Sequence, residues 1–321
     1  MNRVASAYRR FKRSQTIPPF PERVIVELTN RCNYSCVMCP RRFMKDRLGI
    51  MAMPLFKKII DEAGRYPGTI ITPFFRGESL LHPQIIPCLK YIASKKNLSI
   101  LLATNGALMT ASLADRLLDT KIDFISFSVD AVDPETYRRI RNGSYEKVKQ
   151  NIIHFIKKKK KRRLSRPVIQ VSAVDTADSH AGLDSFVSFW LKHADRVRIY
   201  PEHTQDGRFG SLGYRDTRRK PCFKPLSEIA IYWNGEMGLC NHDWNHPLNI
   251  GNVRNISVAE AWHGTAYHQV RTAHLNNTFT NTMPCHGCDH WKMYYQHRKI
   301  VGSLFLRRTK NKKQKGKFHH D

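Results

Sequence analysis

The sequence predicts an α/β fold, a partial (β/α)6 TIM-like barrel followed by a small C-terminal domain of a β-hairpin and loops. Three observations predict this fold class. Short apolar segments alternate with helical patterns from residue 23 to residue 200, three cysteines follow the first apolar segment, and the composition changes after Tyr200. Alternating strands and helices indicate a parallel sheet with right-handed crossover connections.

Six apolar segments of five to seven residues have the length and composition of buried strands. They cover residues 23–28, 69–75, 99–104, 124–129, 168–174 and 196–200. The helical patterns between them cover residues 53–65, 83–94, 111–119, 134–160 and 183–194. Pro54 stands at the start of the first helix, where its missing N–H leaves no helical hydrogen bond unmade. Because the strands are parallel, the loops after their carboxyl ends should share one face of the barrel.

Length and composition set further bounds. A chain of 321 residues can bury a large core. No apolar run approaches the roughly 18 residues that span a bilayer, and the basic N-terminus is not followed by the apolar stretch of a secretory signal. Eight cysteines that occur mainly in groups predict metal binding in a reducing compartment rather than a disulfide scaffold. We therefore expect the protein in the cytoplasm.

The three cysteines after the first strand are Cys32, Cys36 and Cys39. Thiols at these spacings can bind three corners of a cubane iron–sulfur cluster and leave the fourth iron without a protein ligand. That open iron could bind and activate a small molecule. The alternatives are a zinc knuckle or three ordinary buried cysteines. A zinc site needs four ligands, and no His or Cys follows closely behind Cys39.

Polar residues follow the next three strands at their carboxyl ends. Taken singly, each has an ordinary explanation, such as a glycine that permits a turn or an aspartate that starts a helix. Their occurrence on consecutive strands instead predicts a binding site on one face. The residues are Gly77, Glu78, Thr104, Asn105, Ser128 and Asp130, with Arg141 in the helix that follows.

These motifs resemble the radical S-adenosylmethionine (SAM) superfamily over about residues 24–200. The cysteine spacing is that of the family, although Met38 stands where the family has an aromatic residue. Residues 76–79 resemble its Gly-Gly-Glu-Pro segment, whose backbone and glutamate hold the SAM amino group, with Arg76 in place of the first glycine and Ser79 in place of the proline. Ser128 resembles the family's serine on strand four, and Arg141 resembles the arginine that pairs with the SAM carboxylate.

The resemblance implies a 4Fe–4S cluster that binds SAM, with the three cysteines as its catalytic ligands. It also implies that the polar strand-end residues and Arg141 bind SAM. Reductive cleavage of SAM would then give a 5′-deoxyadenosyl radical that abstracts hydrogen from an unactivated C–H bond, while the barrel orients the cofactor and excludes water. A reducing partner such as flavodoxin or ferredoxin would supply the electron.

Four more cysteines follow in the C-terminal third: Cys222, Cys240, Cys285 and Cys288. A predicted hairpin of residues 227–233 and 237–240, turning at Asn234-Gly235, would bring the first two together. Four thiolates can ligate either zinc or a second 4Fe–4S cluster, and spacing alone slightly favours zinc. Four side chains near these thiols are candidates for substrate contact or proton removal, namely His242, Asp243, His246 and His286.

This region resembles the start of the SPASM extension found behind radical SAM cores. Its four cysteines match the shorter twitch version, which implies one auxiliary 4Fe–4S cluster. The likeness is greatest to twitch-type dehydrogenases of sugar or aminocyclitol alcohols, and it implies an oxidoreductase whose auxiliary cluster accepts the second electron of the substrate. An epimerase would need a hydrogen donor, for which Cys88 is a candidate, although such a cysteine is usually a small buried hydrophobe. A ribosomal-peptide maturase often has an extra N-terminal domain, for which the 22 residues before the first strand are too few.

The charge is strongly positive, with 54 Lys and Arg against 26 Asp and Glu. Residues 157–163 are seven consecutive basic residues, and residues 307–317 hold seven more without an acid. Such blocks favour anionic partners. A basic zinc-bearing nucleic-acid-binding protein is the alternative from another class, but the cysteine and strand-end motifs argue against nucleic acid. We expect a small polar substrate, anionic or lipid-linked. The tail is expected either to contact an anionic membrane at the inner face or to be a disordered solubilising segment.

These features divide the chain into four parts. An irregular N-terminal arm covers residues 1–22, and the barrel covers residues 23–200. The auxiliary cluster domain covers residues 201–302, of which 201–220 are expected to form a linker. A basic tail covers residues 303–321.

Overall fold

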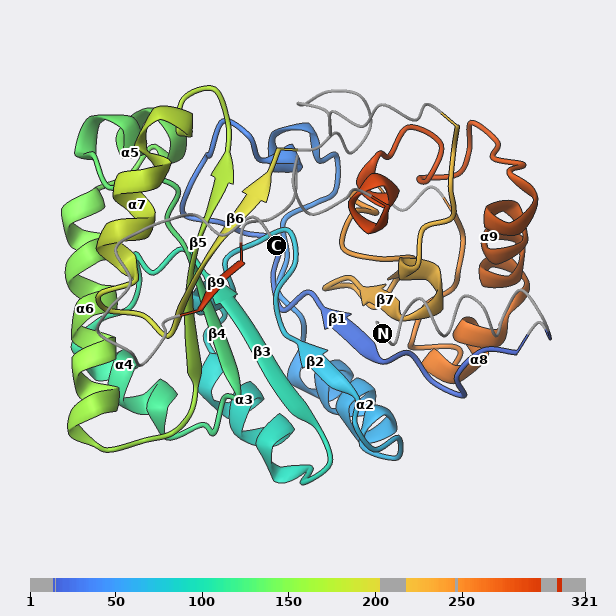
Figure 1. Ribbon diagram of the computed structural model, residues 1–321. Coiled ribbons are helices and arrows are strands. Elements are labelled where there is room, and N and C mark those ends of the chain that lie inside the picture. Colours follow the sequence, from blue (N-terminus) through green and yellow to red (C-terminus); the bar gives the residue numbers. More distant parts are fainter. Residues whose placement is uncertain (1–13, 15, 203–217, 246–247, 296–304, 308–321) are drawn as a thin grey trace.

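The computed structural model of the chain describes residues 14, 16–202, 218–245, 248–295 and 305–307. Most of the expected linker at 201–220, most of the basic tail and the first part of the N-terminal arm lie outside these residues. Within them, the molecule consists of a barrel-like sheet with helices on its outer side and a C-terminal region beside its first strands (Figure 1).

Nine strands form one sheet in the described part of the chain, in the order β8-β7-β1-β2-β3-β4-β5-β6-β9. The six strands of the barrel run parallel and confirm the predicted fold. They are β1 Arg23–Val26, β2 Ile70–Thr72, β3 Ser99–Thr104, β4 Phe124–Ser128, β5 Val168–Asp175 and β6 Arg196–Pro201. β2 ends earlier than the predicted range 69–75 because Pro73 has no N–H to donate to the sheet.

The helices alternate with these strands and cover the outer face of the sheet (Figure 1). They are α2 Met53–Ala63, α3 Ile85–Ser94, α4 Ala111–Leu118, α5 Pro134–Arg141, α6 Tyr145–Lys161 and α7 Leu183–Trp190. The predicted helical stretch 134–160 is two helices. The break occurs because Asn142 adopts a left-handed conformation that ends α5, and the Ser144 side chain then caps α6 by accepting a hydrogen bond from Lys147 N.

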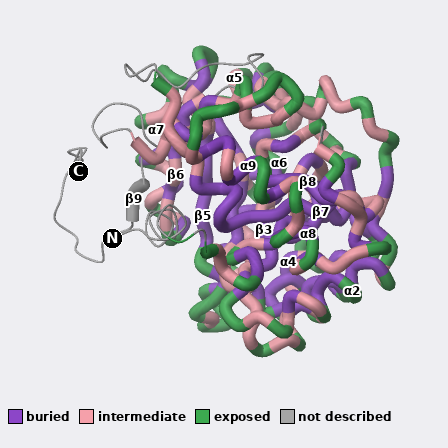
Figure 2. Tube along the Cα trace, turned by 90° about the vertical axis from the view of Figure 1, so that its right-hand side faces the viewer, coloured by how far each residue is buried: buried purple, intermediate pink, exposed green. Residues whose placement is uncertain are grey.

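The core lies between the sheet and its helices, as the buried strands in Figure 2 show. Apolar side chains from β1, β3, β4 and β5 meet those of the helices, and examples with almost no exposed surface are Val26, Leu102, Phe127 and Val171. This rigid frame fixes the carboxyl ends of the strands, where the polar motifs lie.

The C-terminal region continues the barrel sheet. The predicted hairpin is present as β7 Glu228–Ile231 and β8 Met237–Gly238, and Gly235 supplies the positive φ of its turn. β7 also pairs in parallel with β1, a pairing that sequence reasoning did not predict. Two helices follow, α8 Val258–His263 and α9 Thr265–Asn276.

Short elements complete the described chain. A strand, β9 Phe305–Arg307, lies within the predicted tail and pairs antiparallel with β6, so residues 303–321 are not wholly an irregular segment. Five short 3₁₀ helices occur in the described ranges: η1 Pro40–Phe43, η2 Ser79–Leu81, η3 His180–Gly182, η4 Lys224–Leu226 and η5 His290–Tyr294. None of the helices among the described residues combines the length and the apolar composition that crossing a bilayer requires.

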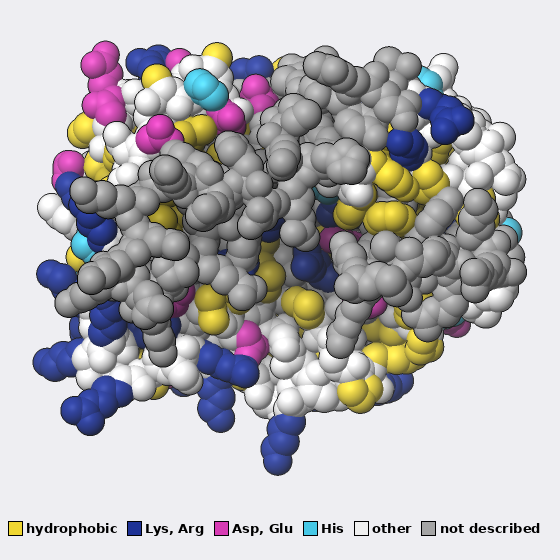
Figure 3. Space-filling view, viewed as in Figure 1, with side chains coloured by type: hydrophobic (Ala, Val, Ile, Leu, Met, Phe, Trp, Pro, Cys, Tyr) yellow, Lys and Arg dark blue, Asp and Glu magenta, His cyan; other side chains and the backbone are white. Residues whose placement is uncertain are grey.

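The basic block 157–163 forms the last turn of α6 and the residues after it. Lys and Arg side chains gather along the lower left edge of the molecule, where α6 ends (Figure 3). Three of the seven pair with acids of neighbouring segments: Lys158 with Asp115, Lys159 with Asp195, and Arg162 with Asp119. The block is therefore a partly neutralised surface at the end of the barrel opposite the carboxyl ends of the strands.

Candidate functional site: two groups of cysteines

The first group of cysteines lies in the loop after β1. The end of α5 holds this loop, since Val37 N donates to Ile140 O at 2.9 Å and Asn142 Nδ2 donates to Ser35 Oγ at 3.1 Å. The Tyr34 ring packs on Gly143 so closely that a Cβ there would come within 2.5 Å of it. The loop is thus fixed by tertiary contacts, which hold the three half-buried thiols in place.

The three thiols lie near enough to one another to interact. Burial, and then the neighbouring Cys36 and Cys32, raise the pKa of Cys39 to about 11. Burial also raises the pKa values of the other two. Crowded thiols of this kind keep their protons until a metal cation replaces them, because the cation stabilises the thiolates.

Glu78 joins the strand-end motifs to one another. Its carboxylate accepts hydrogen bonds from Leu80 N at 3.1 Å, Thr104 Oγ1 at 2.8 Å and Asn105 N at 2.8 Å. Burial raises its pKa, although these donors oppose the shift. Asn105 Nδ2 then donates to Asn33 Oδ1, at 2.9 Å, in the cysteine loop. The structure therefore brings together the predicted residues Glu78, Thr104 and Asn105 beside the first cysteines.

Gly77 lies where two segments of backbone cross. A Cβ at this position would come 2.2 Å from Thr29 O and 2.5 Å from Arg31 O, so no larger residue fits. Glu78 N also donates to Arg31 O at 2.8 Å. The close approach places the Gly77-Glu78 backbone directly against the entry to the cysteine loop.

Arg141 lies on the other side of the loop. Its Nε donates to Asp130 Oδ2 at 2.5 Å, and its guanidinium lies beside the Cys36 thiol, whose pKa it lowers against the larger effect of burial. Asp130 has a positive φ of 72°, and its Oδ1 accepts from Val174 N at 2.8 Å. In the structure, Arg141 is thus paired with Asp130. Ser128 lies at the end of β4, two residues before Asp130.

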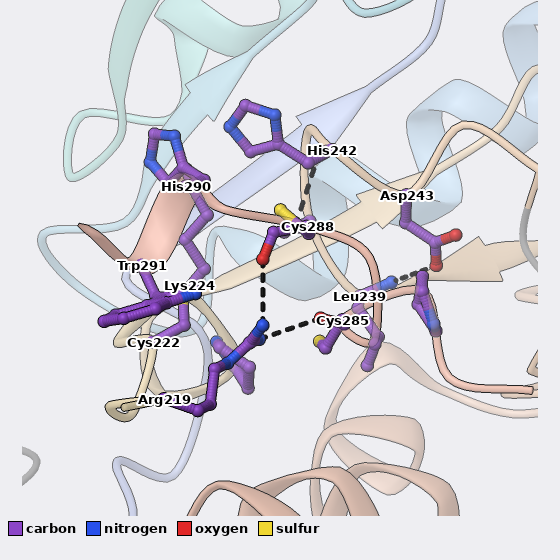
Figure 4. A pocket seen from close by; sticks show the side chains of 13 residues that line it. Arg219, Cys222, Lys224, Leu239, His242, Asp243, Cys285, Cys288, His290 and Trp291 are labelled. Carbon is purple, nitrogen blue, oxygen red and sulfur yellow. Dashed lines mark hydrogen bonds between the residues drawn. The ribbon is translucent and has the colours of Figure 1, made fainter. Parts of the chain in front are cut away.

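The second group of cysteines lines one pocket in the C-terminal region (Figure 4). Cys222 precedes η4, Cys240 follows β8, and Cys285 and Cys288 lie in the segment between α9 and η5. Arg219 holds this last segment by donating to Cys285 O at 2.8 Å and to Cys288 O at 2.9 Å. The fold therefore assembles four thiols from three separate parts of the chain, as the predicted hairpin required.

Two cations accompany these four thiols, the buried Lys224 and the half-buried Arg219. Lys224 pairs with Glu228 at 2.9 Å, and both lie next to Cys222 and Cys240. Burial would lower the pKa of Lys224, but Glu228 and the two thiols raise it, so the ammonium stays charged. Burial raises the pKa of Cys288 to about 12, and Arg219 opposes this shift. Positive charges beside the thiols compensate an anionic group bound by thiolates.

Two family descriptions match the chain over these two regions. The description of the radical SAM superfamily matches residues 26–169, and that of an iron-sulfur cluster-binding domain, SPASM, matches residues 222–289. Residues 26–169 therefore form a radical SAM domain, and residues 222–289 form a SPASM domain behind it. A radical SAM domain implies a 4Fe–4S cluster that binds SAM, and a SPASM domain implies an auxiliary iron–sulfur cluster, so the predicted cofactors are confirmed.

Relatives of this radical SAM protein have several activities. The tungsten-containing aldehyde ferredoxin oxidoreductase cofactor-modifying protein of Pyrococcus furiosus is 24% identical over 310 residues, which cover 81% of this chain and 86% of that protein. A probable GTP 3′,8-cyclase of Methanococcus aeolicus is 30% identical over 131 residues, 40% of this chain and 43% of that protein. The chain thus matches most of the first relative and less than half of the second.

Solved structures share the fold of this radical SAM protein. SuiB from Streptococcus suis matches with a TM-score of 0.68 and 13% identity over 92% of this chain and 78% of that chain. BtrN in complex with AdoMet and 2-DOIA matches with a TM-score of 0.53 and 17% identity over 78% of this chain and 86% of that chain. At such identities the likeness concerns the fold, and it agrees with the predicted partial barrel.

The donor sets fit the clusters that the family implies. The described residues contain no group of three or more His, Cys, Asp or Glu placed to hold one metal ion. Thiolates around a four-iron cluster each bind a different iron, so they lie farther apart than ligands of a single ion. The SPASM match implies an auxiliary iron–sulfur cluster at the four cysteines in place of the zinc ion that spacing alone slightly favoured.

The residues around the auxiliary pocket differ in part from the expected ones. His242 and His290 both line it, with ring centroids 4.1 Å apart, and Asp243 Oδ2 accepts from Leu239 N at 3.0 Å. His286 is exposed and His246 lies outside the described residues. Sequence reasoning missed four residues near the thiols: Arg219, Lys224, His274 and His290. Three of them lie within three residues of a cysteine, which is a signal that could have identified them.

Two of the remaining residues are structural. Cys88 lies on α3 inside the hydrophobic core, and burial raises its pKa to about 12, so it is the small buried hydrophobe that its type suggests. His274 Nδ1 accepts a hydrogen bond from Cys222 N at 3.1 Å, and burial lowers its pKa to about 3. The neutral His274 ring therefore orients the backbone at Cys222.

Proposed function

We propose that the protein is a radical SAM oxidoreductase that removes hydrogen from a C–H bond of a small polar substrate. SAM on a cluster held by the first group of cysteines would supply a 5′-deoxyadenosyl radical that takes one hydrogen atom from the substrate. The substrate radical would then lose a proton to solvent and its second electron to an auxiliary cluster. Cys32, Cys36 and Cys39 hold the first cluster, and Cys222, Cys240, Cys285 and Cys288 hold the second. Glu78, with Thr104 and Asn105, orients the amino group of SAM beside the first cluster.

Arg141, held in place by Asp130, binds the carboxylate end of the methionine group of SAM in this proposal. The guanidinium has one edge on Asp130 and lies beside Cys36. A carboxylate that arrives near Cys36 would therefore meet a cation whose position is already fixed. Gly77 contributes its backbone, since its contact with Thr29 O leaves room for no side chain there, and Ser128 completes the set at the end of β4.

One observation carries the assignment of an oxidoreductase. Four thiols, rather than three, line the auxiliary pocket. A cluster with a cysteine on every iron has no open position for a substrate, so electron transfer is the role that remains to it. The half-buried Arg219 and the buried Lys224 beside the thiols support this role, because positive charge favours the reduced, more negative cluster.

A carbohydrate or cyclitol is the substrate class we propose. The structural likeness to BtrN, whose complex contains AdoMet and 2-DOIA, supports it. A peptide is the alternative, since SuiB with a similar fold has been solved bound to the precursor peptide SuiA. Epimerisation is disfavoured because Cys88, the candidate hydrogen donor, is enclosed in the hydrophobic core. The large positive charge also suits an anionic substrate.

Anaerobic turnover tests the proposal. Purified protein should be brown and contain about eight iron per chain, as two 4Fe–4S clusters require. With a deuterated glycoside or cyclitol and a flavodoxin or ferredoxin as reductant, deuterium should appear in 5′-deoxyadenosine and the product should have lost two hydrogens. Zinc in place of the second set of iron, or a product at the oxidation level of the substrate, would overturn the proposal.

We propose the cytoplasm as the location of the protein, because oxygen-labile clusters need a reducing compartment.

A further inference from the structure

Arg76 is buried between the two halves of the molecule. It stands in the segment that resembles the SAM-binding motif, where the family has a glycine. Its guanidinium is bidentate on Glu27, with Nε to Oε1 at 2.7 Å and Nη2 to Oε2 at 2.9 Å. Nη1 donates to Trp244 O at 2.8 Å and also to the Asp46 carboxylate. The cation lies 4.4 Å from the centre of the Tyr232 ring.

The partners of Arg76 come from four separate segments. Glu27 directly follows β1, and Asp46 lies in the segment after the first cysteines. Tyr232 follows β7 in the hairpin, and Trp244 lies four residues after Cys240. One side chain thus contacts the barrel, the segment behind the first cysteine loop, and the part of the C-terminal region that carries an auxiliary cysteine.

Contacts of several kinds lead from Arg76 toward both cysteine groups, beginning with the cation–π contact to Tyr232. Tyr232 OH donates to Asp243 O at 2.5 Å, and Asp243 N donates to Cys240 O at 3.0 Å. In the other direction, Arg76 immediately precedes Gly77 and Glu78, which lie against Arg31 and the entry to the first cysteine loop. Arg76 is therefore at the centre of a continuous path of contacts between the two sites.

The electrostatics give Arg76 a single conformation. Burial would lower its pKa, but the bidentate Glu27 outweighs this and raises it, so the guanidinium remains charged. Glu27 directly follows β1, and a planar guanidinium pairs with its carboxylate in this way in only one orientation. Movement of the Trp244 segment relative to β1 would break the charged hydrogen bond from Arg76 to Trp244 O, while the bidentate pair with Glu27 holds the guanidinium at β1.

We propose that Arg76 is a positioning residue that fixes the separation of the SAM-binding loop and the Cys240 loop, and thereby the separation of the two clusters. The inference rests on the proposed function only where it concerns electron transfer. The claim that Arg76 fixes the separation of the two clusters depends only on the presence of both clusters, which the two matched domains imply.

A neutral pair at the same place tests the proposal. Glu27→Gln with Arg76→Gln removes both charges, so neither is left buried without its partner, and the bidentate fork is lost. Lys159→Gln with Asp195→Asn is the matched control, because it neutralises an ion pair at the opposite end of the barrel. The readout is the magnetic interaction between the two reduced clusters in electron paramagnetic resonance, which depends on their separation.

The double Gln variant should keep its full iron content and the spectrum of each cluster taken alone, while the interaction between the clusters weakens. The yield of oxidised product per 5′-deoxyadenosine should fall by about 10- to 100-fold, the order of effect that a displacement of about 1 Å can produce. The control pair should change neither the interaction between the clusters nor the yield of oxidised product. If the double Gln variant has lost iron, Arg76→Lys replaces it, since the lysine keeps the charge without the planar fork.

An unchanged cluster interaction in an iron-replete variant would overturn the proposal. A changed interaction with no effect on product yield would keep the positional claim and refute the electron-transfer role of the auxiliary cluster. The two failures are thus distinguishable.

Discussion

The two cysteine groups differ in how the chain builds them. The first is one loop of eight residues from Cys32 to Cys39, next to the end of a single strand. The second takes its thiols from three segments between Cys222 and Cys288, and Arg219 and Lys224 lie beside them. The first site is a single loop at the end of one barrel strand. The second site forms only when the three segments of the C-terminal region have folded together.

This difference has consequences for chemistry and for stability. The local site offers three thiols, so a four-iron cluster bound there would have one iron available to SAM, where the proposed reaction would begin. The assembled site offers four thiols and two cations, so it suits storage and transfer of charge. Loss of the first cluster should spare the fold, while loss of the second should loosen the segments that it joins.

The largest expected effect comes from the first group. Replacing Cys32, Cys36 and Cys39 together with Ala should abolish SAM cleavage and remove about half of the iron, since only the auxiliary cluster remains. Formation of 5′-deoxyadenosine and iron content are the measurements. Cys88→Ala is the control and should leave both measurements unchanged, because this thiol lies on α3 in the hydrophobic core. SAM cleavage that persists in the triple variant would refute the central assignment.

Replacing Cys240 with Ala should have the next largest effect. SAM cleavage should continue in part, because the first loop does not contain this residue, but oxidised product should no longer form. Product and 5′-deoxyadenosine are measured in the same reaction, and their ratio should collapse. Wild-type protein purified anaerobically with zinc on these four thiols would contradict the electron-acceptor role.

Arg219→Gln should weaken the second site without removing it. The guanidinium makes two charged hydrogen bonds to Cys285 O and Cys288 O, each worth roughly 1.5–3 kcal/mol in such settings. Auxiliary iron should therefore be lost more easily to a chelator, while the first cluster is retained. The reduction potential of the remaining auxiliary cluster should fall, because a positive charge has been removed. A potential that rises or stays constant would count against the charge argument.

The smallest effect is expected from the basic tail. Its seven charges should attract anionic vesicles by about 1 kcal/mol per charge near the surface, and salt should release the protein. A chain ended after Arg307 keeps β9 and removes most of the block, so it is a sharper comparison than one ended after residue 302. Sedimentation with vesicles is the measurement. If both chains sediment alike, the tail has no membrane role and the charge of the remainder must account for binding.

Most of the barrel could be predicted from the sequence because its signals are local. Apolar strands, helix patterns and the cysteine spacing all lie within short windows, and β3 was predicted to the residue. Local exceptions came from single residues, such as Pro73, which ends β2, and Asn142, which separates α5 from α6. Both are residue types whose backbone preferences interrupt an otherwise regular element.

Long-range features could not be predicted in the same way. The pairing of β7 with β1 and the partners of Arg76 depend on which segments meet in space. The sequence placed Arg76 near the cofactor because of its neighbours Gly77 and Glu78, yet its side chain is held by Glu27 and the C-terminal region. Zinc and a cluster use the same cysteines, so the choice between them required the match to the SPASM domain.

The parallel pairing of β7 with β1 also bears on how the chain could be divided. β7 covers the outer hydrogen-bonding edge of β1 along its whole length, from Arg23 to Val26. A fragment that stops at residue 200 would expose that row of backbone donors and acceptors. Bare edges of this kind recruit strands from other molecules, so the isolated barrel should aggregate even though its own core is intact. The barrel therefore depends on β7 of the C-terminal region to prevent self-association, independently of any chemistry that the two regions share.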